Sequence, residues 1–324
     1  MRQKIAFRVD ASHQIGFGHL NRCLVLAKEL KKKANILFIM KHNEQANKMV
    51  NHEKFKIIIL EGNLTQIIKK EKINKIIIDL KQGTSKKFVS DIQKTGAKVI
   101  LLDDVGEGRK NADVVIYPVA HLDKKYLKDI KGKLYHGWDY VIVDKKFFGK
   151  RNPRNENQKP KVLVSMGGSD VRNMTPKIID ALKKIKEKFE CTVIIGPGFK
   201  NKNIKVRDKR FKIKRNVTNL ANLMLQSDVG IILFGTSIYE ATAARLPCIL
   251  ISSLRNKQYA ERFSKFQTCI YLNDYNGLNQ KKLIKSVITL LNDQNLIKKL
   301  EYTSRKFLKR KRLIYNVIQD EKRI

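Results

Sequence analysis

Short, nearly continuous apolar runs recur through the first half of the chain, and stretches with helical spacing separate them. Ile- and Val-rich runs without polar alternation are typical of strands that are covered on both faces, as in a parallel sheet with crossover helices. The pattern therefore predicts a doubly wound α/β domain over residues 1–148. Its expected strands are Ile5–Val9, Ile36–Ile39, Ile57–Leu60, Ile76–Asp79, Val99–Asp103 and Val114–Ile116.

The alternation of apolar runs and helical stretches begins again after a polar segment. Residues 149–160 contain prolines and charged residues but no apolar periodicity, which predicts a linker. A second α/β domain is expected over residues 161–324, so that two Rossmann-like domains would face each other across a cleft. Its expected strands are Lys161–Met166, Thr192–Ile195, Val229–Leu233 and Cys248–Ile251.

A glycine turn joins the first expected strand to the first expected helix. Gly16, Gly18 and His19 stand just before apolar positions that recur at helical spacing from Leu20 to Leu30. Such a turn presents backbone N–H groups and the positive end of a helix dipole, which predicts an anion site. His19 adds a group that exchanges a proton near neutral pH. The alternative is that His19 only caps or packs the start of the helix.

The glycine spacing argues against a dinucleotide cofactor. Asn21 stands where the dinucleotide-binding fingerprint has its third glycine. A nicotinamide or flavin enzyme is therefore not expected.

Glycine-led helix starts occur again in the second half, at Gly167-Gly168-Ser169 and at Gly235. Thr236 and Ser237 follow Gly235, and their hydroxyls together with the helix N–H groups suit a diphosphate. Glu240 lies one turn later, where it is placed to accept hydrogen bonds from the hydroxyls of a ribose. The alternative is a capping box in which Glu240 bonds back to Ser237.

Carboxylates stand at the ends of two expected strands. Asp79, Asp103 and Asp104 should lie on the same sheet edge as the loop from Gly16 to His19, where open α/β sheets bind ligands. For Asp79 we favour a capping or solvated role over a functional one.

The chain is strongly basic, with 68 Lys and Arg against 30 Asp and Glu and a formal net charge of +38. Such an excess commonly indicates a nucleic-acid partner. Here it is mostly lysine spread over the expected helices, and no helix-turn-helix, RNP-like or zinc-finger motif accompanies it, so no specific nucleic-acid partner is expected. A basic run at residues 305–312 is interpreted as the solvated face of a last helix, and contact with a polyanion or anionic lipid stays open as the alternative.

The composition also argues against membrane, secreted and disulfide-rich proteins. No apolar run approaches the length of a membrane span, and no secretory leader precedes the first expected strand, so we expect a cytoplasmic protein. The four cysteines are far apart in the 324 residues, which argues against a zinc knuckle or a disulfide framework. They are interpreted as buried small hydrophobes.

The motifs, in their order along the chain, resemble the UDP-sugar hydrolases of the pseudaminic-acid pathway and the related spore-coat polysaccharide proteins. Those proteins are similar in turn to MurG-like GT-B glycosyltransferases. The segments that carry the resemblance are Arg8–Ser12, Ile15–Leu24, Leu102–Asp104, Ala112–Val114, Val162–Asp170, Phe234–Glu240 and Leu246-Pro247.

The resemblance implies a GT-B-like fold and hydrolysis of a UDP-linked diacetamido-trideoxyhexose to UDP and free sugar. His19 would be the general base, and neither a cofactor nor a metal is expected. We expect a monomer. The implied substrate-binding residues are Arg8, Asp10, Gly16, Gly18, Arg22, Gly168, Ser169, Thr236, Ser237, Glu240, Asn256 and Gln258.

Two other functions stay open. One is a glycosyltransferase that passes the sugar to a glycan or lipid acceptor, and the other is a polyanion-binding or RNA-binding protein that retains the cleft. The chain also departs from the family pattern in three places. The family's Asn-Gln pair is interrupted by Lys257, its tyrosine-containing turn is replaced by Asp79-Leu80-Lys81, and Asp144 stands where the hydrolases favour arginine. Which of Asn256 and Gln258 aligns with the family's residue therefore stays open.

Overall fold

The computed structural model describes residues 2–151, 158–201, 203–215, 217–307 and 313–319. The chain divides into two compact units, of which the first comprises Met1–Ile142 with Lys311–Ile324 and the second comprises Val143–Arg310. Each unit has its own parallel sheet and its own core, and each is described separately below.

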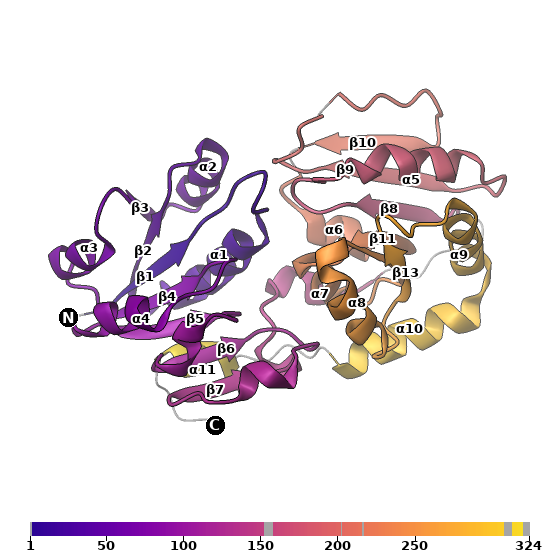
Figure 1. Ribbon diagram of the computed structural model, residues 1–324. Coiled ribbons are helices and arrows are strands. Elements are labelled where there is room, and N and C mark those ends of the chain that lie inside the picture. The colour runs from indigo at the N-terminus through magenta and orange to yellow at the C-terminus, as the bar shows by residue number, and fades with distance from the viewer. Residues whose placement is uncertain (1, 152–157, 202, 216, 308–312, 320–324) are drawn as a thin grey trace. The chain divides into compact units, whose positions relative to one another are not determined.

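The first unit is built on a seven-stranded sheet in the order β3-β2-β1-β4-β5-β6-β7 (Figure 1). Its strands are β1 (Lys4–Val9), β2 (Asn35–Met40), β3 (Lys56–Ile59), β4 (Lys75–Asp79), β5 (Lys98–Leu102), β6 (Val114–Tyr117) and β7 (Lys133–His136). Its helices are α1 (Gly18–Leu30), α2 (Glu44–His52), α3 (Leu64–Lys70), α4 (Lys86–Gln93) and α11 (Leu313–Gln319), with short 3-10 turns η1 (Glu107–Lys110), η2 (Lys124–Leu127) and η3 (Trp138–Tyr140).

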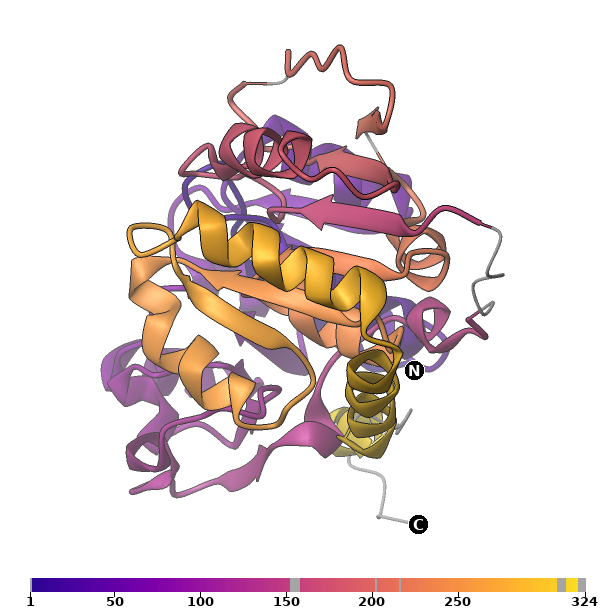
Figure 2. The ribbon, with the colours of Figure 1, turned by 90° about the vertical axis from the view of Figure 1, so that its right-hand side faces the viewer.

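The second unit has a six-stranded sheet in the order β10-β9-β8-β11-β12-β13. Its strands are β8 (Lys161–Ser165), β9 (Glu190–Ile195), β10 (Phe211–Arg215), β11 (Val229–Leu233), β12 (Cys248–Ser252) and β13 (Ile270–Asp274). Its helices are α5 (Met174–Lys183), α6 (Leu220–Leu225), α7 (Thr236–Ala243), α8 (Lys257–Ser264), α9 (Gln280–Asn292) and α10 (Gln294–Phe307), with 3-10 turns η4 (Lys145–Phe148) and η5 (Leu254–Asn256). Figure 2 shows α9 lying across one face of this sheet, where its apolar side joins the core.

Both sheets reverse their strand order at one point. The reversal lies between β1 and β4 in the first sheet and between β8 and β11 in the second. Loops that follow the strands at such a point bind ligands in open α/β folds. The three glycine motifs follow β1, β8 and β11, so the fold places every one of them at a reversal point.

All ten strands predicted from apolar runs occur in the structure, whereas β7, β10 and β13 were not predicted. Each of these three lies at an edge of its sheet. An edge strand is covered less completely, and its sequence accordingly mixes polar with apolar residues, as at the exposed Lys212 and Lys214 of β10. The search for continuous apolar runs misses these three, whereas it finds the fourth edge strand, β3, because three isoleucines follow one another there.

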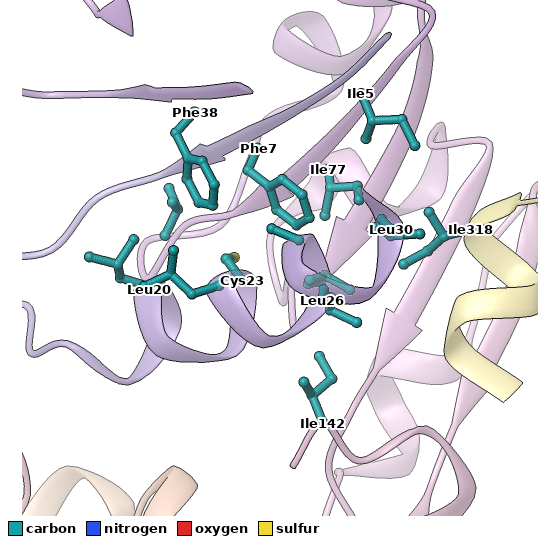
Figure 3. Close-up of a cluster of buried hydrophobic side chains, with 14 of the residues drawn as sticks. Ile5, Phe7, Leu20, Cys23, Leu26, Leu30, Phe38, Ile77, Ile142 and Ile318 are labelled. Carbon is teal, nitrogen blue, oxygen red and sulfur yellow. The ribbon is translucent and has the colours of Figure 1, made fainter. Parts of the chain in front are cut away.

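The core of the first unit fixes helix α1 against the sheet. Leu20, Cys23 and Leu30 are fully buried against strand residues such as Phe7 (Figure 3). The predicted apolar face of this helix is therefore confirmed. Because the face is packed along its length, the first turn of α1 has a defined position above the carboxyl ends of the strands.

The last helix differs from the predicted domain bounds, which assigned all of residues 161–324 to the second domain. Helix α11 belongs to the first unit, where Ile314 and Ile318 are buried in the same core as α1. Figure 3 shows Ile318 beside Leu30, and Lys75 of β4 donates from Nζ to the carbonyl oxygen of Ile318 at 2.8 Å. The two isoleucines lie one turn apart and form an apolar face that the first unit buries.

The predicted linker and the basic run are only partly described. Arg151 packs on the second unit by donating to the carbonyl oxygens of Ser227 and Arg245, and residues 152–157 lie outside the described residues. In the basic run, residues 305–307 end α10, and residues 308–312 lie outside the described residues. None of the described helices combines the length and the apolar character that crossing a membrane requires.

The packing of α11 predicts a measurable contribution to stability. Ile318→Ala should lower the free energy of unfolding of the first unit by about 2–5 kcal/mol, because it removes a fully buried side chain and leaves a cavity. Denaturant titration followed by circular dichroism would measure the change. Tyr302→Ala, at a side chain that is 72% exposed, should stay within about 0.5 kcal/mol of the parent chain. An equally small change for Ile318→Ala would show that α11 does not support the first core.

Candidate active site

A histidine and a carboxylate meet at the edge of the first sheet. His19 lies in the first turn of α1, and Asp79 is the last residue of β4. The Nδ1 atom of His19 lies 2.5 Å from Oδ1 of Asp79, whose side chain has no exposed surface. Because an ionised carboxylate only accepts hydrogen bonds, it holds the imidazole proton on Nδ1. The neutral ring therefore keeps Nε2 unprotonated and able to accept a proton.

Arg22, one turn further along α1, binds the same carboxylate, and its Nη2 lies 3.1 Å from Nδ1 of His19. Its Nε donates to Oδ2 of Asp79 at 2.6 Å, and its Nη2 donates to Oδ1 at 2.6 Å. A third bond runs from Nη1 to Oδ2 of Asp103 at 3.0 Å. Arg22 is thus a buried bridge between the carboxylates at the ends of β4 and β5.

The pairing keeps Asp79 ionised. Burial alone would raise the pKa of Asp79, but the charges and hydrogen bonds of Arg22 and His19 hold it well below its usual range. Burial likewise opposes the charge of Arg22, and the two carboxylates outweigh it and raise the pKa of the guanidinium. The centre of the site is therefore a charged pair whose polar atoms are matched.

The glycine loop in front of His19 is held by a hydrogen bond within the loop and by two from Lys81. The N–H of Gly16 donates to the carbonyl oxygen of Ser12 at 2.8 Å, and Lys81 donates to the carbonyl oxygens of Gln14 and Ile15. Gly16 has a φ of +90°, a conformation that favours glycine. The helix that follows begins without a side-chain cap, so its first N–H groups are available to an anion.

Arg8 and Asp10 lie on the same sheet edge but form an ion pair with each other. Two parallel bonds of 2.6 and 2.7 Å join the guanidinium to the carboxylate, and both side chains are buried. Asp10 also accepts the N–H of Lys41, so the pair ties the end of β1 to the end of β2. Their predicted role in substrate binding stays a prediction.

In the second unit, the first glycine-led helix start is already filled by a protein carboxylate. Asp170 accepts the N–H groups of Met174 and Thr175 at 2.8 Å and the hydroxyl of Thr175 at 2.6 Å. These bonds satisfy the N-terminus of α5. Gly168 and the buried Ser169 shape the loop that leads to it.

The N-terminus of α7, which starts at Thr236, is not satisfied by a side chain. Its cap residue is Gly235, whose backbone is extended and which provides no side chain to satisfy the N–H groups of the first turn. Most other helices with a described cap have one from a side chain. The N-terminus of α7 is therefore open to an external anion, with Thr236 and Ser237 in its first turn.

Glu240 lies one turn into α7 and has an altered acidity. Burial raises its pKa to about 7, with a hydrogen bond from Ser237 acting in the opposite direction and the nearby Asp144 adding to the rise. Ser237 and Glu240 bond to each other, as in the capping-box alternative, but the pair is not a capping box because Gly235 and not Ser237 is the cap residue. Glu240 is thus a half-buried carboxyl group beside an open helix start.

Asn256 and Gln258 flank the first residue of α8. Lys257, which interrupts the family's pair, forms an ion pair with Asp274 at 3.3 Å. Asn256 is half-buried and Gln258 is exposed. Both remain candidates, since the inserted lysine has its own partner in β13.

His19 and Arg22, both expected in the site, lie together in the structure. The structure adds Asp79 and Asp103, which the sequence analysis did not assign to the site. Asp103 was predicted only to lie on this edge. The preference for a capping or solvated Asp79 is wrong, because the side chain is buried and binds both His19 and Arg22. One signal was present in the sequence: a histidine and an arginine one turn apart on the helix face that meets a strand-end carboxylate.

No family model matches the chain. It is 30% identical over 284 residues to the uncharacterized protein MJ1062 of Methanocaldococcus jannaschii, covering 81% of this chain and only 58% of that relative's length. It is 25% identical to the spore coat polysaccharide biosynthesis protein SpsG of Bacillus subtilis, covering 76% of this chain and 77% of that protein. It is 27% identical to the UDP-2,4-diacetamido-2,4,6-trideoxy-beta-L-altropyranose hydrolase of Campylobacter jejuni, covering 79% of this chain and 93% of that protein.

Solved glycosyltransferases have a similar fold. MurG of Acinetobacter baumannii matches with a TM-score of 0.69 at 12% identity, covering 98% of this chain and 99% of that one. The spinosyn rhamnosyltransferase SpnG, solved with thymidine diphosphate, matches with a TM-score of 0.69 at 10% identity, covering 99% of this chain and 100% of that one. The predicted resemblance and the GT-B class of fold, with two Rossmann-like units, are confirmed.

The buried ion pair of Asp79 and Arg22 yields a prediction that can be tested without substrate. In Asp79→Asn, one of the two acceptor oxygens becomes an NH2 donor, so Arg22 and His19 compete for the single oxygen that remains and Arg22 loses the charge of its most buried partner. The free energy of unfolding should fall by about 3–5 kcal/mol. Nitrogen NMR of the His19 ring should also show that the Nδ1–H tautomer no longer dominates.

Asp91→Asn is the matched control for that variant, since Asp91 lies on α4 with a side chain that is 39% exposed. It should change neither measurement. An unaltered tautomer and unaltered stability in Asp79→Asn would contradict the role given to this carboxylate.

Proposed function

We propose that this chain is a nucleotide-sugar hydrolase that converts a UDP-linked diacetamido-trideoxyhexose to UDP and free sugar for nonulosonic acid synthesis. The observation that carries the proposal is the contact between His19 and the buried Asp79 beside a glycine-led helix start. The Campylobacter jejuni relative, named for this reaction and matched over 93% of its length, supports the choice of substrate.

His19 would activate the attacking water. Nε2 takes a proton from the water as its oxygen forms a bond to the anomeric carbon, and the bond from that carbon to the UDP oxygen breaks with its electron pair leaving on UDP. Asp79 stabilises the imidazolium that forms, and Arg22 keeps Asp79 ionised during the step.

The second unit would bind the leaving group. The open N-terminus of α7 with the hydroxyls of Thr236 and Ser237 suits the diphosphate, whose negative charge grows as the bond breaks. Glu240 is proposed to accept hydrogen bonds from the ribose. Asn256 or Gln258 would add a polar contact from the start of α8.

Replacing the proposed base tests the chemistry. His19→Ala should lower kcat for UDP release from the UDP-sugar by at least about 100-fold, the usual contribution of a general base. Chromatography of released UDP measures it, with UDP affinity as a check on folding. His52→Ala, at a side chain that is 78% exposed on α2, should have no effect.

The outcomes of this assay also separate the rival functions. UDP release that is undiminished in His19→Ala would exclude His19 as the base. Release that requires an added glycan or lipid acceptor would indicate a glycosyltransferase instead of a hydrolase.

The helix start of α7 offers a sharper test of the nucleotide site. Gly235→Asp places a carboxylate where the structure has open space and where it can cap the free N–H groups. Stability should rise by a few tenths of a kcal/mol. UDP affinity should fall by at least about 10-fold, because the new carboxylate takes the diphosphate's donors and repels its charge.

Calorimetry with UDP and thermal unfolding would measure the two effects. Gly235→Ala, which adds no charge, should weaken UDP binding much less. Full UDP binding by Gly235→Asp would rule out α7 as the diphosphate site.

A further inference from the structure

The network around Asp79 has a buried centre and two accessible ends. The side chains of Asp79 and Arg22 are 0% and 8% exposed, whereas those of His19 and Asp103 are 24% and 27% exposed. Arg22 joins the two ends, because it donates to both carboxylates. The two accessible side chains are therefore linked through one buried guanidinium.

The backbone separates Asp103 from its acidic neighbour. Asp103 follows β5 with a φ of +54°, a left-handed conformation that costs energy in a non-glycine residue and that is often kept at functional sites. Asp104 instead turns into the protein, where Oδ1 accepts the N–H groups of Thr84 and Gly106. Of two consecutive carboxylates, one thus stabilises a loop and the other is held beside His19 through Arg22.

The charge of Asp103 is not needed to balance Arg22. Asp79 already neutralises the guanidinium with two short bonds, so Asp103 leaves the network with one excess negative charge when His19 is neutral. Arg22 uses only Oδ2 of Asp103. Within the part of the chain that the structure describes, Oδ1 has no hydrogen bond, which leaves an acceptor for a ligand.

We propose that Asp103 contacts the sugar and accepts a hydrogen bond from a hydroxyl or an acetamido N–H group. This inference rests on the proposed function and names the chemistry that selects the sugar. A carboxylate at this place favours sugars that carry such donors and disfavours sugars that carry an acid group there.

Separate titrations with the free diacetamido-trideoxyhexose and with UDP test the inference without any turnover. Asp103→Ala should weaken sugar binding by at least about 10-fold and leave UDP affinity within about twofold. Gly235→Asp should do the reverse. Asp103→Asn, which keeps the shape and one of the two oxygen acceptors, should give an intermediate loss and controls for misfolding.

A hexuronic acid provides a readout that a purely structural role would not change. Removing the carboxylate in Asp103→Asn should improve binding of this acidic sugar relative to the parent chain. Sugar binding that is absent in the parent chain, or equal in the parent chain and Asp103→Ala, would overturn the inference. Asp103-dependent sugar binding without any UDP binding would instead refute the proposed function and leave the inference standing.

Discussion

The ion pair between Asp79 and Arg22 is the interaction on which the arrangement at the carboxyl ends of β4 and β5 depends. Burying a carboxylate is costly unless its oxygens find donors, and here each oxygen takes two: His19 and Arg22 bond Oδ1, and Arg22 and the Cys23 thiol bond Oδ2. Those donors come from consecutive turns of α1, so the pair fixes both the height and the rotation of the helix above β4. The orientation of the His19 ring follows from this arrangement.

The two glycine-led helix starts of the second unit differ in how their N–H groups are bonded. Asp170 fills the N-terminus of α5, whereas α7 begins at a glycine with no side chain to fill it. A helix start whose donors are already bonded cannot stabilise a phosphate, and one whose donors are open can. The same architecture thus yields a helix start that is closed by a carboxylate after β8 and one without a side-chain cap after β11.

Local sequence patterns predicted the interior of the fold better than its edges or its site. Continuous apolar runs mark strands covered on both faces, so the central strands were found and β7, β10 and β13 were not. The apolar face formed by Ile314 and Ile318 predicts burial, but nothing local says which core receives it.

The role of Asp79 was missed for a related reason. A strand-end carboxylate has the same local sequence whether water or a buried arginine binds it. The deciding partners lie 57 and 60 residues away along the chain. The helix starts at Gly18 and Thr236 were predictable because glycine followed by a helical pattern is a local signal.

Charge connects the parts of the proposed site. A chain with a net charge of +38 attracts anions of every kind, which by itself selects nothing. Beside His19 the balance is local: Arg22 binds two carboxylates, Asp79 and Asp103, so this network has more negative than positive groups when His19 is neutral. The two carboxylates disfavour an anion at their own position, while a neutral sugar rich in hydrogen-bond donors is not repelled there. In the proposed function, these carboxylates would therefore favour the sugar and not the diphosphate beside His19.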